Sequence, residues 1–130
     1  MTPREQTVIA TFLAQETPED HYQWLITQGK KGVQAATIGS DKLVPGCPSN
    51  TYFECTITEG RYHISGSSAS YVIAGIIQVI KDIYHLQYVQ SFKPTWPDQM
   101  NLKGLLTYQR WLGVQYMLNL LHPQGSGSRE

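Results

Sequence analysis

Apolar side chains recur at helical spacing in four stretches of the chain. This spacing puts them on one side of a helix, which can then pack against a core. The third stretch is the most apolar, and it predicts a central buried helix of about 15 residues. The predicted helices cover residues 3–14, residues 18 to about 28, the stretch around Val72–Ile83, and residues 107–121.

Polar residues and glycines mark where these helices are expected to begin and end. Thr17 is a candidate N-cap of the second helix, because its hydroxyl can accept a hydrogen bond from a free backbone N–H, and Pro18 suits the first helical position. Gly29 and the Lys30-Lys31-Gly32 group are expected to end that helix, with the cations where the helix dipole favours them. Ser67 or Ser68 is expected to cap the central helix.

Between the second and third helices the pattern changes to an alternation that is typical of a strand. Over residues 51–58, every second side chain belongs to a moderately apolar face. Glu59-Gly60 is a tight-turn signal, and residues 61–65 predict a returning strand, so a β-hairpin is expected. The residues expected on the apolar face are Thr51, Phe53, Cys55 and Ile57.

Helices before and after a hairpin predict an α+β fold. Residues 32–50 are expected to form mostly loop, and residues 85–101 a short helix with loop. We expect a single domain over residues 1–121 and a flexible C-terminal tail over residues 122–130, whose Gly-Ser repeat is typical of linkers.

Charge and cysteine content exclude several function classes. Ten Lys plus Arg balance ten Asp plus Glu among 130 residues, so the chain lacks the basic surface that nucleic-acid binding usually requires. The longest apolar run, residues 71–77, is far shorter than a membrane span, and the N-terminus has no signal-peptide pattern. We therefore expect a soluble cytoplasmic protein. Two cysteines are too few for a disulfide scaffold or a four-thiolate metal site.

The two cysteines lie in different local settings. Cys55 is on the apolar side of the predicted strand, which indicates a small buried hydrophobic residue. Cys47 lies between Gly46 and Pro48 in a stiff loop, where a glycine lets another backbone approach the thiol. A reactive thiol needs a nearby cation or helix N-terminus, and Lys42 is the nearest cation in the sequence. The residues alone leave open whether Cys47 is reactive or inert.

Other candidate chemistry is weak. The four histidines have no metal-ligand spacing, and a cysteine–histidine pair of the thiol-protease type has no local signature. Arg110, one turn into the final helix, is expected to be solvent-exposed or to extend over the apolar face. The histidines are His21, His63, His85 and His122.

The order of the motifs resembles the SufE family, the sulfur-acceptor partners of cysteine desulfurases. HYQWLITQGK leads to LVPGCPSNTYF, then to GSSASYVIAGIIQVIKDIY, and finally to LTYQRWLGVQYML. The family pattern includes V-x-G-C-x-S, G-D-S-D-A and L-x-x-x-R-x-x-G-x-x-x-M, and the resemblance spans about residues 20–121. The matching positions are Gly29, Val44, Gly46, Cys47, Ser49, Gly66, Ser68, Val72, Gly75, Leu106, Arg110, Gly113 and Met117.

The resemblance implies a fold, a reaction and partners. The fold is α+β, with a small, mainly antiparallel sheet packed by helices, as in NifU-like scaffold domains. Cys47 would take a persulfide sulfur from a pyridoxal-phosphate-dependent, SufS-like cysteine desulfurase and pass it to an iron–sulfur scaffold protein. Such an accessory sulfurtransferase needs no cofactor or metal of its own. Gly46, Ser49, Ser68 and Arg110 would support the loop or contact the partner.

Two departures from the family pattern keep alternatives open. Ser67 and Ala69 replace the two family aspartates, and Pro48 follows the cysteine and removes a backbone donor. A non-catalytic SufE-like module, which docks on a desulfurase without carrying sulfur, is the alternative. A thiol enzyme acting on a small molecule is a weaker one. Neither nucleic acid nor membrane is an expected partner, and homodimer formation stays open.

Overall fold

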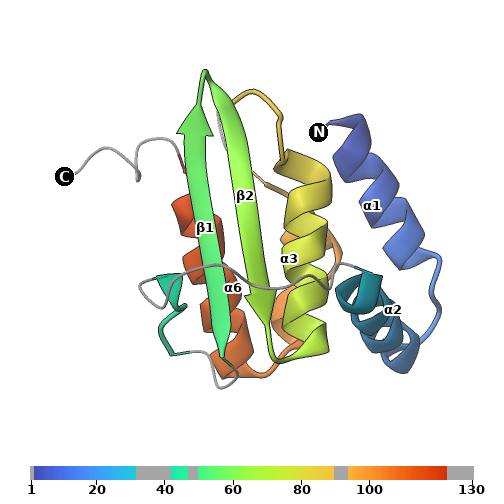
Figure 1. Cartoon of the computed structure of the whole chain (residues 1–130). Coiled ribbons are helices and arrows are strands. Elements are labelled where there is room, and N and C mark those ends of the chain that lie inside the picture. The colour runs from blue at the N-terminus through green and yellow to red at the C-terminus, as the bar shows by residue number, and fades with distance from the viewer. Residues whose placement is uncertain (1, 32–41, 47–49, 90–93, 123–130) are drawn as a thin grey trace.

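The fold is a hairpin packed on helices. The computed structural model describes residues 2–31, 42–46, 50–89 and 94–122. The hairpin forms one layer, α3 and α6 lie behind it, and α1 and α2 flank α3 (Figure 1). The predicted α+β class is confirmed. The elements are α1 (Pro3–Leu13), α2 (Pro18–Lys31), β1 (Thr51–Thr58), β2 (Arg61–Ser68), α3 (Tyr71–Tyr84), α4 (Trp96–Gln99), α5 (Leu102–Leu105) and α6 (Tyr108–Leu120).

The β1–β2 hairpin is antiparallel, and its pairing starts at the predicted turn. Glu59 and Gly60 both have positive φ, 53° and 79°, which gives the turn the backbone twist that two-residue hairpins favour. The returning strand is three residues longer than predicted, because Ser67 and Ser68 pair with β1. Those serines are therefore strand residues and do not cap the next helix.

Hydroxyl side chains cap the N-termini of α2 and α3. Thr17 Oγ1 accepts a hydrogen bond from Asp20 N at 3.1 Å, so the predicted cap of α2 is confirmed. Ser70, rather than Ser67 or Ser68, caps α3: its Oγ accepts from Ile73 N at 3.3 Å. Beyond α3 the short helix expected within residues 85–101 is α4, and α5 follows it without having been predicted.

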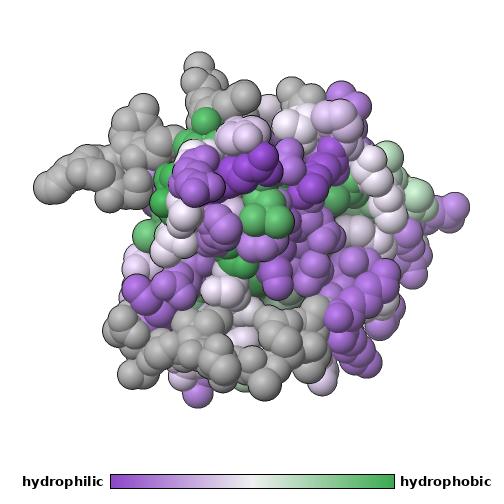
Figure 2. Space-filling view, turned by 45° about the horizontal axis from the view of Figure 1, so that its top comes forward, coloured by the Kyte–Doolittle hydropathy of each residue, from purple (hydrophilic) through white to green (hydrophobic). Residues whose placement is uncertain are grey.

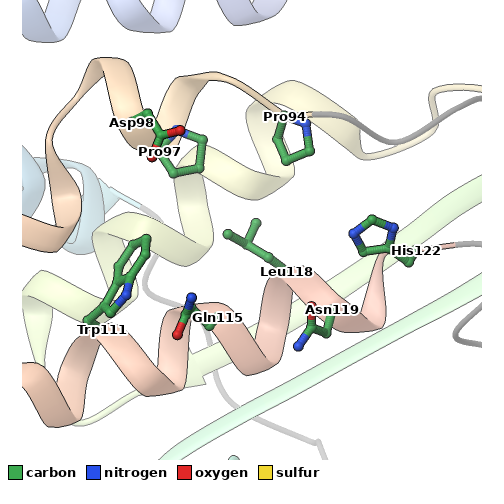
Figure 3. Close-up of a pocket in the computed structure, with 8 residues that line it drawn as sticks. All are labelled: Pro94, Pro97, Asp98, Trp111, Gln115, Leu118, Asn119 and His122. Carbon is green, nitrogen blue, oxygen red and sulfur yellow. The ribbon is translucent and has the colours of Figure 1, made fainter.

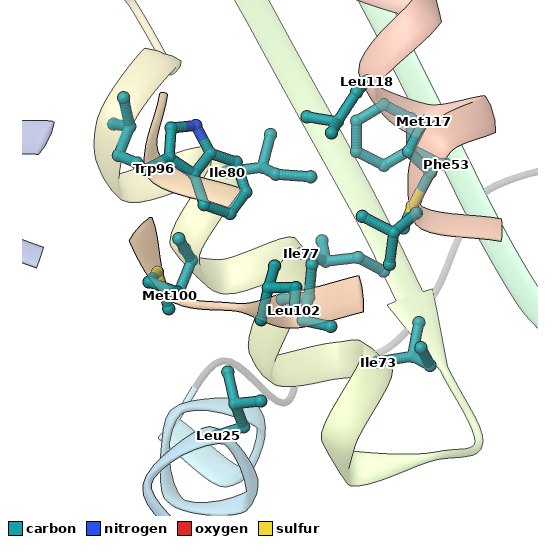
Figure 4. Close-up of a cluster of buried hydrophobic side chains, with 14 of the residues drawn as sticks. Leu25, Phe53, Ile73, Ile77, Ile80, Trp96, Met100, Leu102, Met117 and Leu118 are labelled. Atoms are coloured by element: carbon teal, nitrogen blue, oxygen red, sulfur yellow. The ribbon is translucent and has the colours of Figure 1, made fainter. Parts of the chain in front are cut away.

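Helix α3 is the centre of the hydrophobic core, as its apolar pattern predicts. Ile76 and Ile80 have no exposed surface, and residues of every other element pack around the helix (Figure 4). The hairpin contributes its inner face through Phe53, Tyr62 and Ile64. The turn end of the hairpin extends past the helices, and Ile57 there is 41 % exposed, so the expected apolar face of β1 is buried only at its start (Figure 1).

Gly29 does not end the second helix, contrary to the prediction. It is buried inside α2, which continues to Lys31. A methyl group at Gly29 would collide with the Tyr71 carbonyl of α3, and one at Gly75 of α3 would collide with the Leu25 carbonyl of α2. Two glycines thus allow the backbones of α2 and α3 to touch, and their presence in the sequence reflects helix packing.

One face of the molecule can be examined for surface polarity in the space-filling view of Figure 2. The face drawn in Figure 2 is mainly hydrophilic, with small apolar patches between polar side chains. Among the described residues, no helix is both long and apolar enough to cross a membrane. The expected flexible tail lies outside the described residues, apart from His122.

Candidate functional site

The chain segments on either side of Cys47 pair with each other. Val44 N donates to Thr51 O at 2.7 Å, and Leu43 forms an antiparallel bridge with Tyr52. The pairing closes a short loop that contains Cys47 and anchors both its ends to the start of β1. Cys47 and Ser49 themselves lie outside the described residues.

Gly46 is the last described residue before Cys47, and it is exposed. Its φ is +77°, a backbone conformation that glycine adopts without strain. A methyl group built on Gly46 would meet no described residue within 4 Å. At Gly46 itself, the described part of the chain therefore leaves room for another backbone to approach.

A chain of hydroxyl groups lies under the loop's anchored ends. Thr51 has no exposed surface, and its Oγ1 lies 2.8 Å from Ser68 Oγ. Ser68 Oγ also accepts from Ser70 N at 3.1 Å. Asn50, on the loop's return, accepts through its carbonyl from Ala69 N at 2.9 Å. These bonds tie the loop to the junction of β2 and α3, which is where the family pattern has its two aspartates.

Sequence reasoning missed Asn50 and Thr51 as part of this site. Thr51 was predicted as an ordinary residue of the apolar strand face. A buried threonine hydroxyl needs a hydrogen-bond partner, so a threonine on the apolar face of the strand could have indicated a hydrogen bond at this position. The partner could not be named, because Ser68 was not expected to belong to a strand.

Arg110 lies in the first turn of α6 and is half-buried. Its backbone N–H donates to Thr107 Oγ1 at 3.3 Å, the hydrogen bond that caps the helix. Its guanidinium makes no hydrogen bond or ion pair with a described residue. Helix α6 begins at the same end of the molecule at which β1 begins and β2 ends (Figure 1). The fold thus brings the sequence neighbourhoods of Cys47, Ser68 and Arg110 to one end.

Cys55 is a poor nucleophile in this structure. It is half-buried on β1 and packs against the core, in keeping with its predicted role as a small hydrophobic residue. Burial raises the pKa of its thiol from 9.0 to about 11. Since the thiolate is the reactive form, Cys55 has almost none of it near neutral pH.

His85 lies far from the described residues that anchor the ends of the Cys47 loop. His85 follows the C-terminal end of α3, whereas the loop is tied to the N-terminal end, about 20 Å away along a helix of this length. His85 Nδ1 accepts from Ile64 N at 3.0 Å. Burial lowers the pKa of His85, and Lys81, His63 and Arg4 add to this effect.

Two cavities lie away from the loop. One of about 320 Å³ opens between the α4 region and α6, where Pro97 and Asp98 lie opposite Trp111, Gln115 and Leu118 of α6 (Figure 3). Another, of about 650 Å³, lies between α1 and the end of α3. Neither is lined by described residues of the Cys47 loop, and the described residues hold no cluster of His, Cys, Asp or Glu suited to a metal ion.

Comparison with known proteins gives a family and a fold. The family model for SufE, described as an Fe-S metabolism associated domain, matches residues 6–124. No curated protein matches the chain significantly. Among the solved structures that match is the solution structure of a hypothetical protein from Thermus thermophilus, with a TM-score of 0.73 at 14 % sequence identity. The match covers 95 % of this chain and 94 % of that one, and it supports the α+β fold.

Proposed function

The chain belongs to the SufE family of Fe-S metabolism associated domains, and on that premise we propose that Cys47 is a sulfur acceptor. It receives persulfide sulfur from a pyridoxal-phosphate-dependent cysteine desulfurase and passes it to an iron–sulfur scaffold protein. The protein then works as an accessory sulfurtransferase in the reducing cytoplasm, with the desulfurase doing the carbon–sulfur chemistry.

The proposed step is a thiol–persulfide exchange. The Cys47 thiolate attacks the outer sulfur of the desulfurase persulfide, and a new sulfur–sulfur bond forms on Cys47. The old sulfur–sulfur bond breaks, and its electron pair leaves with the desulfurase thiolate. Atoms and electrons balance without an external oxidant or reductant, and the rate depends on thiolate fraction, leaving-group pKa and access.

The contrast between the two cysteines carries this proposal. Burial raises the pKa of the Cys55 thiol to about 11, which makes Cys55 unsuitable as an attacking nucleophile. Cys47 is the other cysteine of the chain, and it occupies the cysteine position of the family pattern. Its neighbour Gly46 is exposed with open space beside it, as access by a second protein requires.

The anchored ends of the loop also support the proposal. The bonds from Val44 to Thr51 and from Ala69 to Asn50 hold the ends, so a partner that draws the loop outward does not have to unfold β1. Ser68 contributes through its bond to Thr51. We assign Arg110 a role in contacting the desulfurase, because its half-buried guanidinium has no described partner. Ser49 is expected to shape the loop beside Cys47.

Mass spectrometry of the protein after sulfur transfer tests the proposal. The protein is mixed with a cysteine desulfurase and free cysteine, and its intact mass is measured without reductant. We expect the wild type and Cys55→Ser to gain the mass of one sulfur atom and Cys47→Ser to gain none. Equal sulfur gain by Cys47→Ser would contradict the assignment.

Ser67 and Ala69, which replace the two aspartates of the family pattern, are the reason for considering a second function. These residues flank Ser68, next to the loop, and leave this junction without the two carboxylates of the family pattern. A module that docks on a desulfurase without carrying sulfur would bind the enzyme as both wild type and Cys47→Ser, and neither would gain mass. The same experiment, combined with a pull-down, therefore separates the two functions.

A further inference from the structure

Trp111 of α6 has a buried hydrogen-bond donor that no described residue pairs. Its side chain is 8 % exposed, and within the described part of the chain nothing accepts a hydrogen bond from its indole N–H. The other buried tryptophan, Trp96, donates its indole N–H to the Tyr84 hydroxyl at 2.9 Å. A tryptophan N–H that is buried usually finds a partner. The N–H of Trp111 therefore calls for an acceptor from outside the chain.

This donor belongs to the wall of the cavity of about 320 Å³ between the α4 region and α6. Figure 3 shows the indole nitrogen of Trp111 on the edge of the ring that faces Gln115, which also lines the cavity. Gln115 is exposed, and its side-chain amide makes no hydrogen bond with a described residue. The α6 wall thus offers one N–H donor and one amide that can donate or accept.

The opposite wall of the cavity has a negative charge from Asp98. This carboxylate is exposed and forms no ion pair with the described residues. Among the described residues that line the cavity there is no lysine, arginine or second carboxylate, and the other titratable one is His122, at the end away from Trp111 (Figure 3). A carboxylate in this setting favours a ligand with a positive charge, which can also donate hydrogen bonds to it.

The remaining wall of the cavity includes apolar surface. Pro97 and Leu118 are both buried and both line the cavity, and the ring of Trp111 adds to them. Such walls favour a hydrocarbon stem behind a charged head. The volume of about 320 Å³ is near the lower end for ligand pockets, so a single amino-acid residue fills it better than a large cofactor does.

We propose that this cavity binds an arginine residue of a partner polypeptide. The guanidinium donates to Asp98, the methylene stem packs on Leu118 and Pro97, and a peptide carbonyl beside the arginine accepts from the Trp111 N–H. Arginine suits the site better than lysine, because its planar guanidinium can donate two parallel hydrogen bonds to one carboxylate and stack on an aromatic ring. Cys47 takes no part in this contact, so the proposal does not depend on sulfur transfer.

Nuclear magnetic resonance titration of the ¹⁵N-labelled protein tests the site. The probe is the blocked tripeptide acetyl-Gly-Arg-Gly-amide, and the signal is the indole N–H resonance of Trp111, which is identified by its loss in Trp111→Phe. We expect this resonance to shift in a saturable manner as the peptide is added. The same peptide with citrulline in place of arginine keeps the size but lacks the charge, and it should bind about tenfold more weakly.

Charge variants of the protein give the second arm. Asp98→Asn should weaken binding of the arginine peptide by about tenfold. Asp82→Asn is the matched control, because Asp82 is an exposed aspartate that lines the other cavity, and it should leave binding unchanged. The absence of a Trp111 shift, equal binding of the citrulline peptide, or equal effects of the two variants overturns the proposal. Free arginine that binds as tightly as the peptide also overturns it, since the ligand would then be a free amino acid.

Discussion

The hydroxyl of Thr51, the first residue of β1, lies 2.8 Å from the hydroxyl of Ser68, the last residue of β2. Thr51 has no exposed surface, and its carbonyl receives the hydrogen bond that closes the loop containing Cys47. The two residues are also strand partners in the hairpin. This pair therefore joins the base of the proposed sulfur-carrying loop to the junction between β2 and α3.

Replacing Thr51 by valine tests this link. Valine keeps the shape of the side chain but removes its hydroxyl, so the partly buried hydrogen bond to Ser68 is lost. We expect the free energy of unfolding to fall by about 1–2 kcal/mol, measured by urea denaturation. Thr56→Val, at an exposed position of the same strand, should change it by less than about 0.5 kcal/mol. Equal losses in both variants would show that the pair contributes nothing specific.

The glycine contact between α2 and α3 predicts a large effect from a single methyl group. In Gly29→Ala, the new methyl meets backbone atoms of Tyr71 and Gly75, which cannot move without displacing α3. We expect a loss of about 3 kcal/mol or more in the free energy of unfolding. Gln23→Ala, at an exposed position on the same helix, is the control and should be near neutral. A stabilised Gly29→Ala variant would contradict the close packing, because alanine otherwise favours helices.

The raised pKa of Cys55 predicts its alkylation rate as a function of pH. Burial favours the neutral thiol, so the thiolate fraction stays very small until the pH nears the value of about 11. In Cys47→Ser, reaction with iodoacetamide should be slow at neutral pH and rise steadily with pH up to that range. Guanidinium unfolding should accelerate it by moving the pKa back toward 9.0. Fast labelling of folded Cys47→Ser at neutral pH would contradict this.

His85 predicts a loss of stability in mild acid. Its Nδ1 accepts a hydrogen bond from Ile64 N, and burial followed by the charges of Lys81, His63 and Arg4 lowers its pKa below the ordinary 6.5. The unfolded chain thus takes up the His85 proton at a higher pH than the folded protein does. The stabilisation that neutral His85 gives to the folded protein is therefore complete above pH 6.5. The free energy of unfolding falls as the pH drops from 6.5 toward the lowered pKa of His85 in the folded protein.

His85→Gln separates this effect from other titrating groups. The glutamine side chain can accept the bond from Ile64 N but does not titrate, so unfolding free energy should depend less on pH between neutral pH and mild acid than in the wild type. Urea denaturation at several pH values measures the difference. The same pH dependence in both proteins would exclude His85 as its source.

The sequence predicted those elements whose cause is local. The apolar repeat of α3 and the Glu59-Gly60 turn are properties of neighbouring residues, and both were confirmed. Gly29 was misassigned because glycine commonly ends helices, whereas here it is kept inside α2 by contact with Gly75, a residue far along the chain. Ser67 and Ser68 were misassigned for a similar reason, since their strand conformation depends on pairing with β1.

In the candidate site, too, some residues could be predicted from the sequence and others could not. The resemblance to the SufE family singled out Gly46, Ser68 and Arg110, and the structure brings their segments to one end of the fold. Asn50 and Thr51 were missed, because their role consists of hydrogen bonds to residues that are distant in the sequence.

The central claim is that Cys47 accepts sulfur, and a single-turnover transfer tests it most directly. A cysteine desulfurase is loaded with persulfide, freed of cysteine and mixed with this protein, and the peptides of both proteins are then mapped by mass without reductant. We predict that each sulfur lost by the desulfurase appears on the peptide containing Cys47, with none on Cys55. Sulfur on Cys55, or a complex that forms while the desulfurase keeps its sulfur, would contradict the account.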